Sequence, residues 1–227
     1  MTMKEFGKRV GKGSIVIWPI GAVEEHGPHL PLCTDSIQPE LIAEEVAQLT
    51  GALIAPPLRY GNCGSTSKFP GTLSLSFDTL RAIAHDVISE LARNGFKKIV
   101  VLSGHAGRLH MAALRAAAEK VVEDRDVKIM VLSDYDIAYA MKDPDIPEDD
   151  GHAGMIETSR VMAIKPKLVK ARPKAFHPKF PPYQVLRSYN PHFPEGYHGD
   201  PRKASARKGR EFNRFIAKEL ARLVKEM

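Results

Sequence analysis

Cysteine is scarce in this chain of 227 residues, which contains only Cys33 and Cys63. Two cysteines do not build the disulfide framework of a small secreted domain, and they fit a reducing compartment. No apolar run approaches the length of a membrane span, and the first residues, Met1–Phe6, lack the apolar region of a secretory signal. The sequence therefore predicts a cytoplasmic protein without a membrane partner.

Two further classes of protein lack support. The net charge of +6 comes from 33 Lys and Arg against 27 Asp and Glu, and much of the excess is spread over residues 165–225 among prolines and acidic residues. No stripe of basic and aromatic residues and no nucleic-acid motif accompanies it. We therefore expect a solvated basic face and no nucleic-acid partner, although the basic surplus leaves an anionic substrate open. No G-x-G-x-x-G motif follows a predicted strand, which argues against a phosphate-binding Rossmann protein.

Apolar runs alternate with helical patterns along the whole chain. Strands are predicted at residues 14–20, 52–55, 97–103 and 126–133, and a short helix and turn at 3–12. Helices are predicted at 39–49, 79–93, 109–123 and 203–225, and another is opened by residues 151–159 and runs to about 164. We expect Asp78 to cap the helix that begins at Thr79. This alternation indicates an α/β fold with a largely parallel sheet, in one domain over residues 1–227. Residues 166–201 are irregular and rich in proline, and they predict a lid or an interface segment.

A dense cluster of possible metal ligands follows the first predicted strand, in the sequence GAVEEHGPHLPLCTD at residues 21–35. Open α/β sheets build their sites where strands end, and converging carboxylate and imidazole groups bind divalent metals. The candidate ligands in this stretch are Glu24, Glu25, His26 and Asp35, with His29 nearby. A polar surface loop with chance charges is the alternative.

Two further glycine–histidine turns carry the same kinds of side chain. His105 lies in SGHAG, at a strand-to-helix turn, and we expect it at the sheet edge that also holds the first loop. His152 lies in GHAG at the start of a predicted helix, and Glu157 follows it. The three segments together supply the ligands and the acid or base that a hydrolytic metal site needs, and a carboxylate such as Asp35 can bridge two metals. Taken alone, His105 is equally well explained as a buried core histidine.

These segments resemble the creatininase (creatinine amidohydrolase) family. The motifs FPGTLSL at 69–75, GHAGMIETS at 151–159 and GDPRKAS at 199–205 occur with them in the order of that family, over nearly the whole chain. The resemblance implies a three-layer α/β/α fold and two divalent metals, with zinc first and manganese or iron as alternatives. It also implies hydrolysis of a carbon–nitrogen bond, often in a cyclic or formyl amide, by a homo-oligomer that is commonly a hexamer.

By the same resemblance, two metals would share one bridging carboxylate. The first metal would bind Glu24, Asp35 and His105, and the second would bind His26 and Asp35. In creatininase proper, a glutamate two residues after the histidine that matches His105 completes the second site, and this chain has Gly107 there. We expect Glu157 to replace that glutamate, against the alternative of a structural role at the helix start.

The expected reaction is the attack of a metal-activated water on an amide carbonyl. His152 matches the family's catalytic histidine and would stabilise the intermediate or protonate the leaving nitrogen, with Glu25 in a proton-handling or orienting role. His29, and Tyr60 and Ser65 in the glycine-rich loop 56–77, are candidates to contact a small-molecule amide substrate.

The sequence leaves several substrates open. Creatininase proper places tryptophans over its substrate ahead of the catalytic histidine, whereas the single tryptophan here, Trp18, lies in a predicted core strand. A formamide or another cyclic amide is therefore expected, with creatinine, a formylaminopyrimidine nucleotide and a precursor peptide as alternatives. A non-catalytic metal-binding assembly protein, supported only by Gly107, is the alternative of another class.

Overall fold

The computed structural model describes residues 1–11, 13–141 and 146–227, and a parallel four-stranded sheet with the order β2-β1-β3-β4 lies at its centre. The strands are β1 (Ile15–Ile20), β2 (Leu53–Ile54), β3 (Lys98–Ser103) and β4 (Lys128–Ser133). Strand β1 pairs with β3 over its whole length, from Ile15 opposite Lys98 to Ile20 opposite Ser103. The prediction of a parallel sheet is confirmed.

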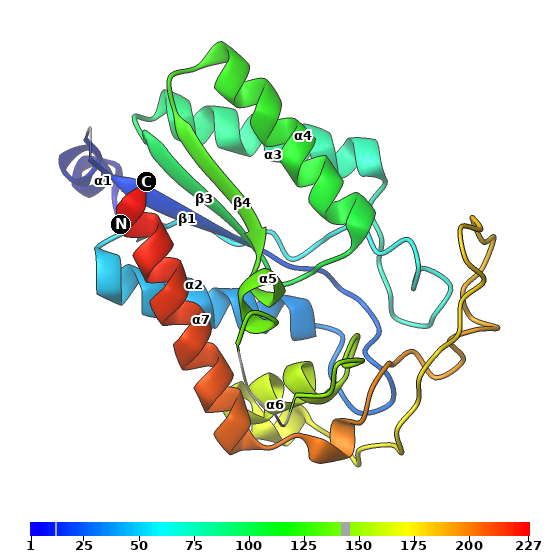
Figure 1. Cartoon of the computed structure of the whole chain (residues 1–227). Helices are drawn as coiled ribbons and strands as arrows, with labels where there is room; N and C mark the ends of the chain where they lie inside the picture. Colours follow the sequence, from blue (N-terminus) through cyan, green and yellow to red (C-terminus); the bar gives the residue numbers. More distant parts are fainter. Residues whose placement is uncertain (12, 142–145) are drawn as a thin grey trace.

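Helices cover both faces of this sheet (Figure 1). Helices α3 (Phe77–Arg93) and α4 (Arg108–Asp124) lie on one face, and α2 (Thr34–Thr50) and α7 (Ala206–Glu226) lie on the other. Successive side chains of a strand point to opposite faces, so β1 contributes to two cores. Trp18 packs with α3 and α4, and Ile17 packs with α2 and α7. The predicted three-layer α/β/α fold is confirmed, and the single tryptophan is a core residue.

The remaining elements flank these layers. Helix α1 (Met3–Arg9) precedes β1, α5 (Asp134–Ala138) follows β4, and α6 (Met155–Ile164) packs against α7 and α2. The irregular segment 166–201 begins with the 3-10 turn η1 (Pro166–Leu168), and a second turn, η2 (Pro201–Lys203), follows it. In the described parts of the chain, no helix is both long enough and apolar enough to cross a membrane. The assignment of residues 1–227 to one domain stays a prediction.

Helix α2 begins five residues before the predicted start. It begins at Thr34, so Asp35 lies in its first turn and Pro39 lies inside the helix. Proline has no amide proton, and the missing hydrogen bond is the one that would have reached the carbonyl of Asp35. A Cβ on Gly104 would lie 2.1 Å from that carbonyl oxygen, so only glycine lets the turn after β3 pass so close to the start of α2.

The starts of two other helices also differ from the predictions. Helix α3 begins at Phe77, and its cap is Ser76 instead of Asp78, because the Ser76 hydroxyl accepts a hydrogen bond from the Thr79 amide at 3.1 Å. Helix α7 begins at Ala206, after the turn η2, where the sequence predicted a start at residue 203. Helix α1 ends at Arg9, in agreement with the predicted short helix and turn, and Lys12 at the end of that prediction lies outside the described residues.

The strand order places a topological switch point between β1 and β3. After β1 the chain goes to the neighbour on one side, β2, and it then returns to the neighbour on the other side, β3. Connections on opposite sides leave a crevice at the carboxyl ends of such strands, and ligands of open α/β sheets bind there.

Candidate metal centre

Side chains from four parts of the chain converge at the carboxyl ends of β1 and β3. The loop after β1 supplies Glu24 and His26, and the first turn of α2 supplies Asp35. His105 follows β3 directly, and Glu157 lies in the first turn of α6. All five side chains are buried. The topology therefore brings together the five residues that the sequence predicted as metal ligands.

The carboxylate of Asp35 lies between two imidazole rings. Its Oδ1 atom is 3.0 Å from Nε2 of His26, and its Oδ2 atom is 3.0 Å from Nδ1 of His105. Oε2 of Glu24 is 2.9 Å from the same nitrogen of His105, and Oε2 of Glu157 is 3.3 Å from Nε2 of His26. The side chains thus form two groups that share Asp35, one with Glu24 and His105 and one with His26 and Glu157.

Backbone carbonyl groups fix the tautomers of both histidines. Nδ1 of His26 is 3.1 Å from the carbonyl oxygen of Glu24, and Nε2 of His105 is 3.0 Å from the carbonyl oxygen of Asn62. A carbonyl oxygen only accepts hydrogen bonds, so each of these nitrogens carries a proton. In the neutral rings, the other nitrogen then presents a lone pair to the carboxylates, which is the arrangement typical of metal-binding histidines.

The carboxylates are held from outside in a similar way. The hydroxyl of Thr66, in the loop between β2 and α3, donates to Oε1 of Glu24. The amide of Ala153, whose φ is 52°, donates to Oε2 of Glu157 at 2.7 Å. These partners orient both carboxylates before any ligand binds.

Buried lone pairs face one another at this centre. While both rings are neutral, Oε2 of Glu24, Oδ2 of Asp35 and Nε2 of His26 are, among the described residues, buried atoms without a hydrogen-bond partner. Buried polar atoms without a partner are costly and uncommon, and a cation between them removes that cost. Carboxylate oxygens and imidazole nitrogens are also the donors that zinc and related divalent metals prefer. The residues present therefore fit a divalent metal.

Opposite charges dominate the electrostatics of the centre. Burial acts to raise the pKa of Asp35, but His26 and His105 hold that pKa well below its usual range. Burial acts to lower the pKa of His26, but Asp35 and Glu157 outweigh it and raise the pKa to about 10. The negative field that favours a proton on His26 equally favours a metal cation between these ligands.

His152 lies beside this cluster and is held by Glu25. Its Nε2 atom is 2.8 Å from the carbonyl oxygen of Glu25 and 3.3 Å from Oε1 of the same residue. Its ring lies 4.3 Å, between centroids, from the ring of His26. Burial acts to lower the pKa of His152, but the hydrogen bond with Glu25 and the nearby carboxylates raise it above its usual value. The described contacts therefore place Glu25 against His152.

A cavity of about 320 Å³ opens over these residues. Glu24, Asp35, His105, His152 and Glu157 line one side of it, together with Ser65. Phe180, Tyr189 and Phe193, all from segment 166–201, line the other side, with Phe180 5.8 Å from Tyr189 and 6.1 Å from Phe193 between ring centroids. We call these three residues the aromatic wall.

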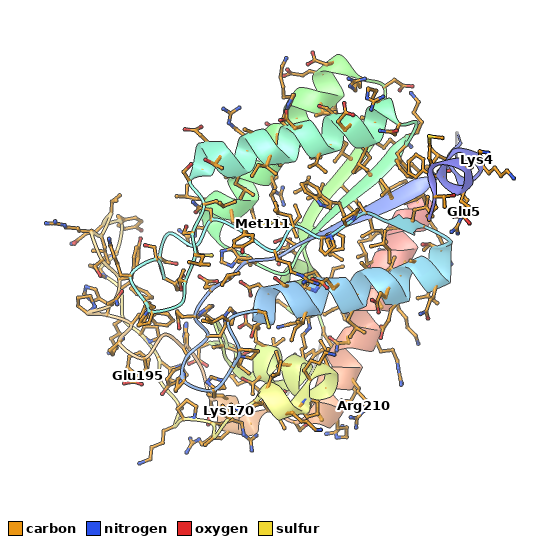
Figure 2. All side chains as sticks on the ribbon, turned by 180° about the vertical axis from the view of Figure 1, so that it is seen from behind. Lys4, Glu5, Met111, Lys170, Glu195 and Arg210 are labelled. Atoms are coloured by element: carbon orange, nitrogen blue, oxygen red, sulfur yellow. The ribbon has the colours of Figure 1, made fainter. Side chains whose placement is uncertain are left out.

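The segment that carries the aromatic wall also packs against another loop of the chain. Figure 2 shows this segment, near the labelled Glu195, beside the loop between β2 and α3. The rings of Phe69 in that loop and Phe193 are 6.2 Å apart between centroids. Two irregular segments that are distant in sequence therefore meet at the mouth of the cavity.

Two residues predicted to contact substrate lie outside the lining of this cavity. His29 is fully buried, and its Nε2 atom is 3.1 Å from the carbonyl of Ala153 and 3.0 Å from the hydroxyl of Thr158. Tyr60 is a largely exposed residue of the loop after β2. His29 thus packs behind the centre, and the geometry supports a substrate contact only for Ser65, which lines the cavity.

Several residues of the site were not predicted from the sequence, and Cys63 is one of them. Its Sγ atom lies within 4.8 Å of ligand atoms of Glu24 and His105. Burial, followed by the charge of Glu24, raises the pKa of this thiol, which keeps it protonated and makes it a poorer ligand than the carboxylates. The glycine-rich loop 56–77 was recognised as functional, but nothing in its pattern distinguishes Asn62, Cys63 and Thr66 from their neighbours.

Comparisons with known proteins identify the family. The family model for Creatininase (creatinine amidohydrolase) matches residues 1–224. A creatinine amidohydrolase of Pseudomonas putida is 36% identical over 213 residues, which cover 82% of this chain and 79% of that protein. A mycofactocin precursor peptide peptidase of Mycolicibacterium smegmatis is 33% identical over 161 residues, which cover 67% of this chain and 58% of that protein.

Solved structures agree with this match. A crystal structure of creatinine amidohydrolase (creatininase) superimposes with a TM-score of 0.91 at 30% identity, over 100% of this chain and 95% of that chain. A structure of creatininase with Mn gives a TM-score of 0.91 at 28% identity, over 100% of this chain and 96% of that chain. The family match and these likenesses extend over almost the whole chain, and the chain therefore belongs to the creatininase family of amidohydrolases.

Proposed function

We propose that this protein hydrolyses the carbon–nitrogen bond of a small amide with the help of two divalent metals. The observation that carries the proposal is the position of Asp35, whose two oxygens each lie 3.0 Å from a different histidine. A carboxylate in this position is suited to bridge two metals. The first metal would be held by Glu24, Asp35 and His105, and the second by His26, Asp35 and Glu157.

Glu157 supports the second metal position in the absence of a side chain at Gly107. Its Oε2 atom is 3.3 Å from Nε2 of His26 and is held by the amide of Ala153. A Cβ on Gly107 would lie only 2.4 Å from Nε2 of His105, so a larger residue there would displace the ring from its position. The chain therefore gains a carboxylate from α6 in place of one from the turn after β3.

Divalent metals at these positions would lower the pKa of a bound water and polarise a carbonyl group. The chain supplies the proton chemistry. Because Nε2 of His152 donates to the carbonyl of Glu25, the ring presents Nδ1 as its second proton-carrying atom. We assign to His152 the protonation of the leaving nitrogen, and to Glu25 the orientation of the His152 ring.

The cavity favours an uncharged substrate with a flat apolar group. Phe180, Tyr189 and Phe193 offer ring faces and edges across from the metal ligands. Among the described residues that line the cavity, none is Lys or Arg, and three are carboxylates. No Lys or Arg side chain of the described lining could pair with a phosphate group, which would depend on the metals alone for positive charge. These features support a cyclic amide or a formamide over a nucleotide, and the surplus of basic residues lies elsewhere.

The finer features of this proposal follow from the family and the sequence. Zinc is the proposed metal by resemblance to the family. Manganese and iron are the alternatives, since carboxylate and imidazole donors suit all three metals. The proposed assembly is a homo-oligomer, a hexamer by resemblance, and the proposed location is the cytoplasm.

The test of the proposed function is hydrolysis by metal-loaded protein of a panel of formamides, cyclic amides including creatinine, and short peptides. We expect turnover of at least one small amide, its loss after treatment with a chelator, and its return on addition of zinc or manganese. Metal binding without hydrolysis of any member of the panel would contradict the proposal and favour the non-catalytic metal-binding alternative.

Replacing Phe193 by alanine tests the aromatic wall. The substrate is expected to lose a ring contact worth about 1–1.5 kcal/mol, so KM should rise about tenfold while kcat changes little. Steady-state kinetics on the best amide of the panel measures both constants. Tyr60→Ala is the matched control, since Tyr60 lies outside the cavity lining. An unchanged KM in Phe193→Ala, or a larger rise in Tyr60→Ala, would contradict the assignment of the wall.

A further inference from the structure

A closed ring of hydrogen bonds lies directly behind His105. Nε2 of His105 donates to the carbonyl of Asn62 at 3.0 Å, and the amide of Asn62 donates to Nδ1 of His110 at 3.2 Å. Nε2 of His110 is 3.0 Å from the hydroxyl of Ser103. That hydroxyl donates to the carbonyl of His105 at 2.7 Å and accepts from the amide of His105 at 3.0 Å. The path therefore leaves His105 from its ring and returns to its backbone.

Every proton in this ring has only one consistent position. The amide of Asn62 is a donor, so Nδ1 of His110 is an unprotonated acceptor and the His110 ring is neutral. Nε2 of His110 then carries the proton and donates to Ser103, which accepts two hydrogen bonds and donates one. All donors and acceptors are satisfied without conflict, which is typical of buried polar networks that fix one conformation.

The packing around His110 holds its ring against His105 and against the loop after β2. His110 lies in the first turn of α4, is fully buried, and meets the ring of His105 edge to face at 4.9 Å between centroids. A Cβ on Gly61 would lie 2.7 Å from Nδ1 of His110, so glycine is required for the loop after β2 to approach it. The side-chain amide of Asn62 also donates to the carbonyl of Leu75 at 2.7 Å, which holds the loop in place.

We infer that His110 is a positioning residue. It holds the backbone of Asn62 in place, and the carbonyl of Asn62 in turn fixes the tautomer and the orientation of the His105 ring. The ring of hydrogen bonds holds a proton on Nε2 of His105 and turns Nδ1 toward Glu24 and Asp35, 2.9 and 3.0 Å away. His110 does not line the cavity, and it acts on His105 through Asn62 and Ser103 and through the contact between the two rings. This inference rests on the proposed function, because it takes His105 to be a metal ligand.

Substitutions at residue 110 separate positioning from packing. His110→Phe keeps the size and shape of the ring but removes both hydrogen bonds, and it leaves the amide of Asn62 without a partner. His110→Asn is smaller but retains an oxygen close to the position of Nδ1, which can accept from that amide. Positioning therefore predicts that metal binding is retained better in His110→Asn, whereas simple packing predicts that it is retained better in His110→Phe.

The experiment measures the dissociation constant for zinc in apo protein, by competition with a chelating dye, together with the visible spectrum of the cobalt-substituted protein. We expect zinc binding about 10–100-fold weaker in His110→Phe, a shifted cobalt spectrum, and a return of both toward the parent in His110→Asn. His85→Phe is the control, because His85 is an exposed histidine on α3.

The outcomes distinguish this inference from the proposed function. Parent affinity in His110→Phe, or equal weakening in the two variants, would overturn the inference while the metal site stands. A parent protein that binds no zinc would overturn both. If His110→Phe does not fold, Ser103→Ala removes the hydroxyl at the other end of the ring, and unchanged zinc affinity in that variant would equally overturn the inference.

Discussion

Replacing Asp35 by asparagine is expected to remove most of the metal from both positions and to abolish measurable turnover. Its two oxygens face His26 and His105, so the substitution takes a negatively charged ligand from each group at once. Loss of an outer hydrogen-bond partner typically costs about 10–100-fold in metal affinity or activity, and loss of a shared ligand should cost more. Elemental analysis of protein purified without added metal gives the content per chain of parent and variant.

The matched control for this substitution is Asp86→Asn. Asp86 is an exposed carboxylate on α3, far from the cavity lining, and its variant should keep parent metal content and turnover. Asp35→Asn that retained full metal content and activity would refute the assignment of the site. The metal content of the parent protein also tests whether the second position is occupied. About two metals per chain would support Glu157 as the replacement ligand, and about one metal would indicate a mononuclear site.

Much of the fold could be predicted from local patterns of the sequence. The apolar runs at β1 and β3 are long enough to predict buried strands, and the histidine and carboxylate residues that follow them share one edge because parallel strands end together. The start of α2 was harder to predict. Proline usually marks the first turn of a helix, so Pro39 predicted a start one turn too late, and the structure places it inside the helix instead.

The hydrogen-bond partners of the site residues could not be predicted from local patterns. Thr66 meets Glu24, Asn62 meets His105, and Glu25 meets His152 across 42, 43 and 127 residues of chain. Each pair joins loops whose own patterns do not depend on the other loop, so no periodicity marks the pairing. The aromatic wall could not be predicted for a similar reason. Its residues lie in an irregular segment, where no helical or strand period indicates which way a side chain points.

Replacing His152 by glutamine is expected to lower turnover about 10²–10⁴-fold, the usual contribution of a general acid, while metal content stays at the parent value. The side-chain amide of glutamine can still donate a hydrogen bond to the carbonyl of Glu25, as Nε2 of His152 does, but its N–H groups are too weakly acidic to transfer a proton to a leaving nitrogen. His198→Gln is the matched control, since His198 lines the same cavity and is not bonded to the loop after β1.

The metal count of this variant decides between two roles for the histidine. Ligand atoms of His152, Glu24 and His26 lie within 4.8 Å of one another, so His152 is itself within reach of a metal. A ligand role predicts that metal and turnover fall together in His152→Gln, whereas a proton-transfer role predicts that only turnover falls. Because Nε2 is already bonded to Glu25 and the ring stacks on His26, the geometry favours proton transfer. An active variant with full metal would instead assign the proton to another group.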